Sequence, residues 1–139
     1  MNEPNLKKRV RDMMTTRVVA VTRQYHARDL AVLLQTGRFS GVPVIDAGNL
    51  LRGMVTEFDI LKALVEGKDL STTTAEDIMS SDSISIEETA TAEEAIDMML
   101  NHAIIRMPVV RNGKLIGLIA RSDVLDHMIE PNLINVYGS

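Results

Sequence analysis

The sequence repeats itself at a spacing of 65 residues, and this repeat limits the chain to a duplicated fold. Val42-Pro43-Val44-Ile45 returns as Met107-Pro108-Val109-Val110, and Asp12-Met13-Met14 returns as Asp77-Ile78-Met79. After the prolines the spacing is 64 residues. Self-similarity at a fixed spacing is typical of proteins built from repeated structural units. We therefore expect two similar units, with one residue lost from a turn in the second.

Each copy contains the pattern of a β-hairpin. Two short apolar runs rich in β-branched residues enclose Asp46-Ala47-Gly48-Asn49 in the first copy and Arg111-Asn112-Gly113-Lys114 in the second. Asn-Gly favours a two-residue hairpin turn, because both residues tolerate the positive φ angles that such a turn requires. The sequence therefore predicts one hairpin in each unit.

Helices are predicted on both sides of each hairpin. Apolar residues recur at helical spacing over residues 26–36 and 91–101 before the hairpins, and over residues 57–65 and 122–129 after them. Thr91 with Glu94 is typical of a capping box at a helix start. Gly67 and Pro131 are stop signals for the later helices.

Short strands over residues 18–21 and 84–86 complete each unit. The predicted fold class is therefore α/β (α+β), with two β-α-β-β-α units related by a pseudo-twofold axis. One unit of about 55 residues buries too little surface to be stable alone, so the two should pack together. Clefts between packed units are common sites for small molecules.

The repeat also divides the chain into segments. We expect an N-terminal tail or helix start, a first repeat, a polar linker, a second repeat and a C-terminal tail, over residues 1–9, 10–66, 67–74, 75–130 and 131–139.

Composition excludes several classes of function. The 139 residues carry 19 acidic and 15 basic side chains, and the net charge of −4 is unfavourable for binding nucleic acid. The absence of cysteine excludes disulfides, thiolate zinc sites and thiol nucleophiles, and makes the cytoplasm the expected compartment. No apolar stretch approaches the roughly 18 residues of a bilayer span, and the polar start is unlike a signal peptide.

The segment Gly53-Met-Val-Thr56-Glu-Phe-Asp59 is the main candidate for chemistry. It places a hydroxyl and a carboxylate three residues apart at a helix start, where free backbone amides also lie. Such groups can hold a sugar and a phosphate, because the carboxylate accepts from ribose hydroxyls while the amides donate to phosphate oxygens. The same spacing is also a capping pattern, in which Asp59 bonds back to the Thr56 amide.

The duplicated unit, with Pro-Val and Gly-x-x-Thr-x-x-Asp in its first copy, resembles a pair of cystathionine-β-synthase (CBS) domains, a Bateman module. The resemblance covers residues 10–130, nearly the whole chain. It implies a disc-like pairing of the repeats, dimers of such discs, and binding of adenosine derivatives in two clefts between the repeats.

The resemblance also implies a set of residues for each cleft. The Thr56 cleft would use Thr56 and Asp59, with the base near Ser83, Ile84, Ser85, Ile104 and Ile105. The Asp123 cleft would use Asp123, with the base near Val18, Val19, Ala20, Phe39 and Ser40. Ala120 departs from the pattern there, and a lost neutral hydrogen bond of about 1 kcal/mol weakens binding without abolishing it.

Charge is expected to distinguish the two clefts. Arg106 and Arg38 resemble positions from which the family reaches ligand phosphates, and with Arg121 they would face the Asp123 cleft. Glu57 adds a negative charge near the Thr56 cleft. Coulomb attraction then favours phosphorylated nucleotides at the Asp123 cleft and a neutral or cationic adenosyl compound at the Thr56 cleft. For each arginine, a solvated surface charge is the alternative.

Other candidate sites are weaker. His26, His102 and His127 lack the spacing of metal ligands. The basic run over residues 7–11 is more typical of a solvated surface than of an RNA contact. No catalytic triad, phosphate loop or carboxylate pair is present, so we expect no enzyme activity, and a nucleotide hydrolase would lack a base and a nucleophile.

The sequence therefore predicts a stand-alone regulatory module that forms a homodimer. It would bind AMP, ADP, ATP or a compound like S-adenosylmethionine, with no required cofactor or metal, and signal occupancy to an unidentified partner protein. The alternative is a structural adaptor whose clefts are vestigial and whose dimer surface is the function.

Overall fold

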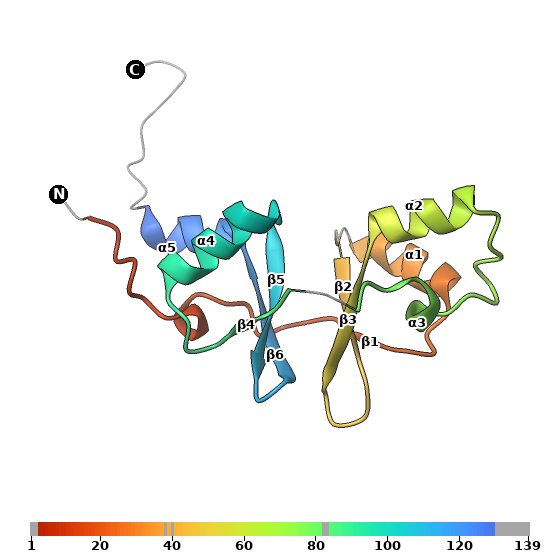
Figure 1. Ribbon diagram of the computed structural model, residues 1–139, viewed down its shortest axis with the longest axis horizontal. Coiled ribbons are helices and arrows are strands. Elements are labelled where there is room, and N and C mark those ends of the chain that lie inside the picture. The colour runs from red at the N-terminus through yellow and green to blue at the C-terminus, as the bar shows by residue number, and fades with distance from the viewer. Residues whose placement is uncertain (1–2, 38, 40, 82–83, 130–139) are drawn as a thin grey trace, which may run out of the picture.

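The computed structural model describes residues 3–37, 39, 41–81 and 84–129, and both copies of the repeat form the same arrangement of sheet and helices (Figure 1). In chain order the elements are η1 (Val10–Asp12), β1 (Val21–Thr22), α1 (Ala27–Gly37), β2 (Gly41–Ile45), β3 (Leu51–Thr56), α2 (Glu57–Val65), α3 (Ala75–Ile78), β4 (Ile86–Glu87), α4 (Ala92–His102), β5 (Arg106–Arg111), β6 (Lys114–Ala120) and α5 (Arg121–Met128). The predicted mixed fold of two units is confirmed.

Each unit contains a three-stranded sheet, in the order β1-β2-β3 or β4-β5-β6. The first two strands of each sheet are parallel and the last two are antiparallel. A parallel pair needs a crossover, which α1 and α4 supply. Asn112 and Gly113 have φ angles of 53° and 78°, so the predicted hairpin turn of the second copy is confirmed.

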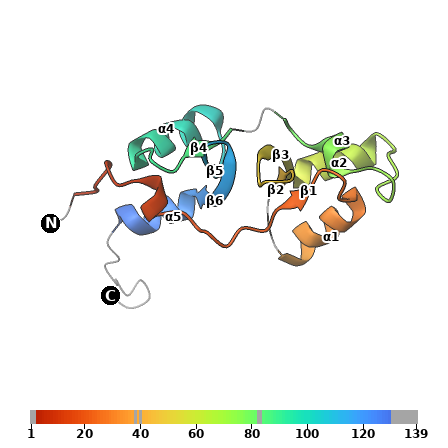
Figure 2. The ribbon, with the colours of Figure 1, turned by 90° about the horizontal axis from the view of Figure 1, so that it is seen from below.

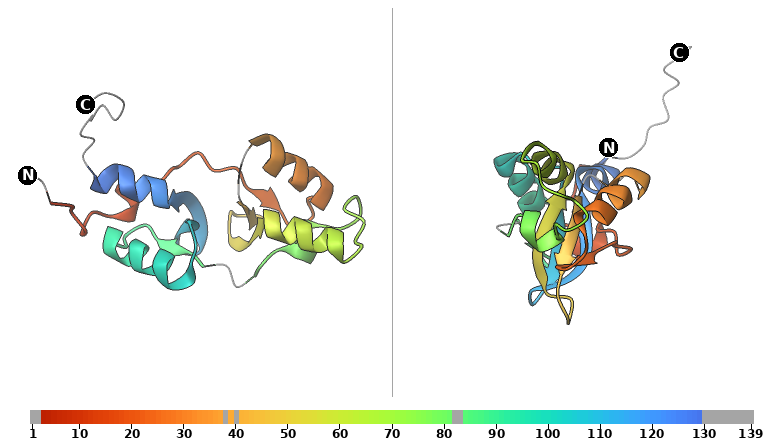
Figure 3. Two further views of the ribbon diagram at one scale, coloured as in Figure 1. Left: turned by 90° about the horizontal axis from the view of Figure 1, so that it is seen from above. Right: turned by 90° about the vertical axis from the view of Figure 1, so that its right-hand side faces the viewer.

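Helices α1, α2, α4 and α5 lie at one end of the molecule and the hairpin turns at the other (Figure 1). Seen along that axis, α1 and α5 form one row while α2 and α4 form a second row (Figures 2 and 3). This arrangement has the expected pseudo-twofold relation between the units, because it exchanges α1 with α4 and α2 with α5.

The short strands begin later than predicted. Residues 18–20 and 84–85 lie outside any strand, while β1 and β4 begin at Val21 and Ile86. Only two residues of each strand find partners, Val21 opposite Val44 and Ile86 opposite Val109 in the second sheet. The apolar composition therefore predicted the approximate position of each strand. The length of each strand depends on which residues pair with the neighbouring strand.

The segment at the start of each repeat packs on the opposite repeat. We call residues 5–15 the first arm and residues 70–80 the second arm. Val10 of the first arm is buried in the core of the second repeat, and Ala75 of the second arm is buried in the core of the first. Thr15 pairs with Leu118, and Ser80 pairs with Met54. The two repeats are therefore joined by a reciprocal exchange.

The arms also complete the first helix of each repeat. The amide of Ala27 donates to the Thr73 carbonyl at 2.8 Å, and the amide of Ala92 donates to the Lys8 carbonyl at 2.8 Å. Amides in the first turn of a helix have no partner within that helix. The predicted linker and N-terminal tail thus have a structural task in addition to connecting the repeats.

The hairpin turns contact each other across the pseudo-twofold axis. The Leu51 amide donates to the Gly113 carbonyl at 3.0 Å, and the Leu115 amide donates to the Asn49 carbonyl at 2.9 Å. These reciprocal bonds join the repeats at the end remote from the helices. None of the helices in the described part of the chain is both long enough and apolar enough to cross a bilayer.

Candidate functional site

A cavity of about 670 Å³ lies between the two repeats. It is lined by residues of β2, β3 and α2 from the first repeat, by the end of the second arm and the segment after it, and by the chain that connects α4 to β5. The lining residues are Gly41, Met54, Thr56, Glu57, Phe58, Leu61, Ser80, Ile84, Ala103, Ile104, Ile105, Arg106 and Pro108. Its volume is in the range of small-molecule sites.

Local backbone structure brings these side chains together. Strand β3 ends at Thr56, where α2 begins, so Thr56 lies at the mouth of a strand-to-helix turn. Gly41 is its partner in β2. On the opposite repeat, α4 ends at Ala103 in the left-handed conformation, with φ of 51°, and the chain then turns toward β5. That turn places Ile104, Ile105 and Arg106 in succession along the cavity wall.

The cavity combines apolar walls with a few polar groups. Most lining side chains are aliphatic or aromatic, and the polar or charged ones are Thr56, Glu57, Ser80 and Arg106. The Arg106 Nε is buried and has no hydrogen-bond partner among the described residues. An unsatisfied buried donor is costly, and a guanidinium binds carboxylate and phosphate oxygens well. The geometry therefore suits a largely apolar ligand with an anionic group.

Asp59 forms the helix cap at the start of α2. Its Oδ2 accepts from the Thr56 amide at 2.7 Å and from the Thr56 hydroxyl at 3.1 Å. Asp59 lines a smaller hollow of about 330 Å³, which shares Ser80 with the large cavity. Of the two interpretations of this Thr-x-x-Asp pattern, the cap is present in the structure, and the carboxylate lies beside the cavity wall.

Asp123 has the equivalent capping role in the second repeat, where it accepts from the Ala120 amide at 2.8 Å. It lines neither the large cavity nor the hollow beside it, and the same holds for Val18, Val19, Ala20 and Arg121. The Arg121 amide donates to the Ile105 carbonyl at 2.8 Å. Phe39 packs against the core of the first repeat.

The structure brings together four residues expected at the Thr56 cleft, namely Thr56, Ile84, Ile104 and Ile105. Ser85 is half-buried outside the lining. Ser83, Arg38 and Ser40 lie outside the described residues.

The structure places Arg106 at the Thr56 cleft. It was assigned to the Asp123 cleft, but it lines the same cavity as Thr56. Residues 103–105 lie outside regular structure, so Arg106 continues the wall formed by the two isoleucines before it. Because Arg106 and Glu57 line the same cavity, the charge difference from which a neutral or cationic ligand was expected at the Thr56 cleft is reduced.

Sequence reasoning missed several lining residues, including Gly41, Phe58 and Leu61. Gly41 occupies the position equivalent to Arg106, so the repeat alignment contained a signal for it. Phe58 and Leu61 follow Thr56 by two and five residues on α2, a spacing that would have indicated one helix face.

No cluster of three or more potential metal ligands occurs in the part of the chain that the structure describes. Two groups near the arms have shifted pKa values. The Thr74 amide and hydroxyl bonded to Asp77 lower the pKa of that carboxyl, and the Arg111 guanidinium lowers the pKa of Glu88.

Comparison with known proteins gives consistent matches. A family model described as CBS domain matches residues 10–66 and 75–130. The CBS domain-containing protein YhcV of Bacillus subtilis is 33% identical over 116 residues, covering 83% of this chain and 81% of YhcV. A crystal structure of CBSX2 in complex with AMP has a TM-score of 0.75 and 28% identity, covering 86% of this chain and 94% of CBSX2.

A further solved structure shares the fold. The CBS domain pair of protein MJ0100, in complex with 5′-methylthioadenosine and S-adenosyl-L-methionine, has a TM-score of 0.75 and 23% identity. The alignment covers 86% of this chain and 98% of that domain pair.

Proposed function

This chain belongs to the CBS domain family, and from that premise we propose that it is a regulatory module which binds an adenosine derivative between its two repeats. The repeats are those assigned from the sequence, residues 10–66 and 75–130. In this proposal the protein is a sensor that has no enzyme activity of its own and acts in the cytoplasm.

The cavity lined by Thr56 and Arg106 is the observation that carries this proposal. Its volume of about 670 Å³ and its aliphatic walls suit a purine nucleoside. The base would lie against Ile84, Ile104 and Ile105, which form an aliphatic part of the cavity wall.

Arg106 makes an anionic ligand the preferred one. A phosphate would give the buried Arg106 Nε the partner that it lacks among the described residues. Glu57 is exposed, so its charge is well screened by water and opposes the phosphate only weakly. AMP, the ligand of CBSX2, therefore fits this cavity better than the cationic S-adenosylmethionine, one of the ligands of MJ0100.

Thr56 and Asp59 would hold the remaining polar groups of the nucleotide. The amides in the first turn of α2 can donate to phosphate oxygens, and the Thr56 hydroxyl oxygen, whose hydrogen is donated to Asp59, can accept a hydrogen bond from the ligand. Asp59 uses Oδ2 for its cap bonds, and a carboxylate with a second oxygen can also accept from ribose hydroxyls. Binding at the Asp123 cleft stays a prediction.

A homodimer would form through the exposed apolar side chains of the helices. Phe58 is 81% exposed, Val65 is 89% exposed and Leu100 is 74% exposed. Leu61 and Leu125 add to the same helical end of the molecule. A shift in how two copies pack would then pass ligand occupancy to a partner protein, which requires different ligand affinities in the two arrangements.

Calorimetric titration of the purified protein with AMP, ATP, adenosine and S-adenosylmethionine tests the ligand proposal. We expect AMP to bind more tightly than adenosine. Absence of heat for all four compounds up to millimolar concentration would refute it. The sedimentation coefficient of the wild type and of Phe58→Glu, which we expect to be monomeric, tests the dimer.

A structural adaptor is the second candidate, and the exposed apolar helix residues favour it independently of the cavity. It predicts a stable dimer with no response to nucleotides. A sedimentation experiment with and without AMP distinguishes the two functions, because only the sensor changes its dimer shape or its dissociation constant.

A further inference from the structure

The two arms lie against sites of opposite charge on the two repeats. The first arm places Arg11 beside Glu88, and the second arm places Glu76 beside Arg23. Arg11 and Glu76 occupy equivalent positions in the two arms, and Glu88 and Arg23 occupy equivalent positions in the two repeats. We call Glu88 with Arg111 the second socket, and Arg23 with Asp46 the first socket. The signs are reversed at all three pairs of equivalent positions.

The second socket is well ordered by hydrogen bonds. The Glu88 side chain is 10% exposed and receives two bonds from the Arg111 guanidinium, one of them from Nη2 to Oε1 at 2.9 Å. The Arg11 amide donates to the Glu88 carbonyl at 3.0 Å. The positive charges of Arg111 and Arg11 both lower the pKa of Glu88.

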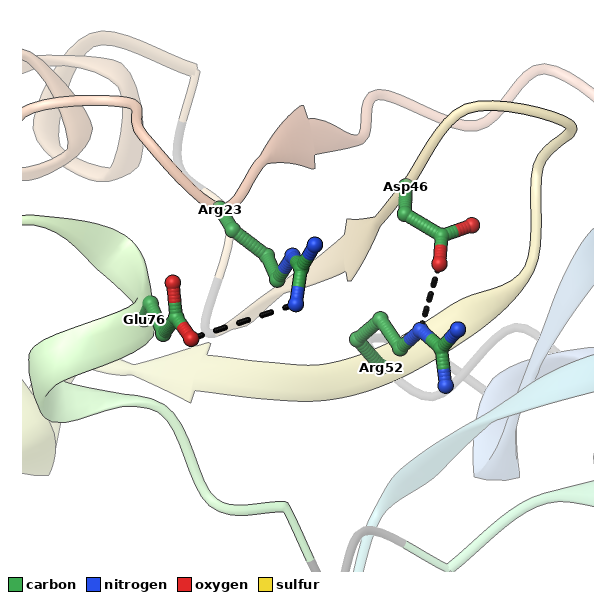
Figure 4. Close-up of polar contacts among 4 residues, drawn as sticks. All are labelled: Arg23, Asp46, Arg52 and Glu76. Carbon is green, nitrogen blue, oxygen red and sulfur yellow. Dashed lines mark hydrogen bonds and ion pairs between the residues drawn. The ribbon is translucent and has the colours of Figure 1, made fainter.

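The first socket has the same backbone contact with the charges exchanged. The Glu76 amide donates to the Arg23 carbonyl at 3.0 Å, and Arg23 Nη1 lies 3.9 Å from Glu76 Oε1 (Figure 4). Asp46, at the position equivalent to Arg111, pairs with Arg52 at 2.5 Å (Figure 4). The backbone contact between arm and repeat is therefore duplicated and the charges are inverted, while the second charged residue of each socket pairs differently, Arg111 with Glu88 and Asp46 with Arg52.

The apolar contacts of the two arms are of the same kind. Val10 and Ala75 are both fully buried. A Cβ on Gly117 would lie 2.8 Å from Met14 Sδ, and a Cβ on Gly53 would lie 2.9 Å from Met79 Sδ, so each arm fits its socket through the same methionine-on-glycine contact. The methionine-on-glycine contact could therefore form in either arrangement, whereas Val10 and Ala75 differ in size and would not exchange without a loss of packing.

The charges do distinguish the two arrangements. With each arm on its own repeat, Arg11 would lie against Arg23 and Glu76 against Glu88, so both contacts would be repulsive. In the observed exchange both are attractive. Like charges held together at such positions are destabilising, in the same way as on helices and sheets.

We propose that the inverted charges of the two sockets determine which arm docks on which repeat. The exchange has a consequence for the cavity, because it brings Ser80 and Ile84, at and beyond the end of the second arm, to the wall beside Thr56. This inference concerns the assembly of the fold and does not depend on which ligand binds.

A double-mutant cycle at the first socket tests the charge contribution. Glu76→Arg and Arg23→Glu should each raise the unfolding equilibrium constant about two- to fivefold, as expected for exposed ion pairs, and the double variant should return it to near the wild-type value. Asp97→Arg is the matched control, since it makes the same charge change on the exposed face of α4. In 1 M NaCl the coupling should shrink. A double variant no more stable than the sum of its singles overturns the proposal.

A disulfide experiment measures the docking of the first arm on the second repeat directly. The chain has no cysteine, and Thr15 and Leu118 exchange two backbone hydrogen bonds, so their Cα atoms lie within disulfide range. In the double variant Thr15→Cys/Leu118→Cys, we expect an intramolecular disulfide. Equilibration with glutathione measures the effective concentration of one thiol at the other.

Adding Arg11→Glu and Glu76→Arg to that variant makes both docking contacts repulsive. The effective concentration should then fall about tenfold, as the summed effect of two attractive charge contacts that become repulsive. An unchanged value overturns the proposal. If this variant does not fold, the first-socket cycle decides alone.

Discussion

Replacing Arg106 by glutamine should convert the cavity from one that prefers AMP to one that treats AMP and adenosine alike. The side chain keeps much of its length and its polarity but loses its charge. Because the Arg106 Nε has no partner among the described residues, the substitution removes no intramolecular bond of that atom. We therefore expect the melting temperature to stay close to that of the wild type.

The expected magnitude follows from the chemistry of the guanidinium. A hydrogen bond to a charged group contributes about 1.5–3 kcal/mol. One such bond between Arg106 and the phosphate corresponds to an increase of about 10- to 150-fold in the Kd for AMP. Adenosine has no phosphate, so its Kd should change by less than about twofold, within the usual error of additivity for separate groups.

Calorimetric titration of both ligands into the wild type and Arg106→Gln measures this ratio directly. Arg121→Gln is the matched control, because it removes the same charge from an exposed arginine outside the cavity lining. It should leave the ratio unchanged. The reasoning is refuted if Arg106→Gln preserves the wild-type preference for AMP, or if Arg121→Gln abolishes it.

Three further predictions concern stability. Asp59→Ala should lower the free energy of unfolding by about 1 kcal/mol even without ligand, because it removes the cap of α2; urea unfolding measures this. Ala103→Gly should raise the free energy of unfolding by about 1 kcal/mol, because Ala103 adopts the left-handed backbone conformation, which glycine adopts without strain. The lowered pKa of Glu88 should stabilise the fold above the ordinary glutamate pKa of about 4.3, and the urea midpoint should fall as the pH drops below it. Arg111→Gln should flatten that dependence.

The sequence predicts well those parts of the fold that depend on local patterns. The 65-residue repeat, the Asn112-Gly113 turn and the helix beginning after Thr91 all have short-range signals, and the structure confirms them, including the bond from the Glu94 amide to the Thr91 hydroxyl. The arms have no such signal. Helix η1 has three residues and α3 has four, so both are too short to show a helical periodicity. Each of them packs on the opposite repeat, and no local pattern indicates that contact.

The candidate site was predictable in its parts and less so in its assembly. Thr56, Ile104 and Ile105 were assigned to one cleft because the resemblance to CBS domain pairs implied it, and the structure places them around one cavity. Arg106 was separated from its neighbour Ile105 and assigned to the other cleft. Its side-chain direction depends on how the chain turns between the left-handed Ala103 and β5, and no residue pattern specifies that turn.

The difference between Gly41 and Arg106 explains how a symmetric fold acquires an asymmetric site. These residues are equivalent in the two repeats, and both line the same cavity. A Cβ on Gly41 would lie 3.3 Å from Met54 Cε and 3.4 Å from Thr56 Cγ2, so a larger residue would crowd the wall that Thr56 forms. Two arginines would also place like charges in one hollow. Glycine in the first repeat thus leaves space beside Thr56, while arginine in the second supplies a charge, so the two repeats contribute different groups to one cavity.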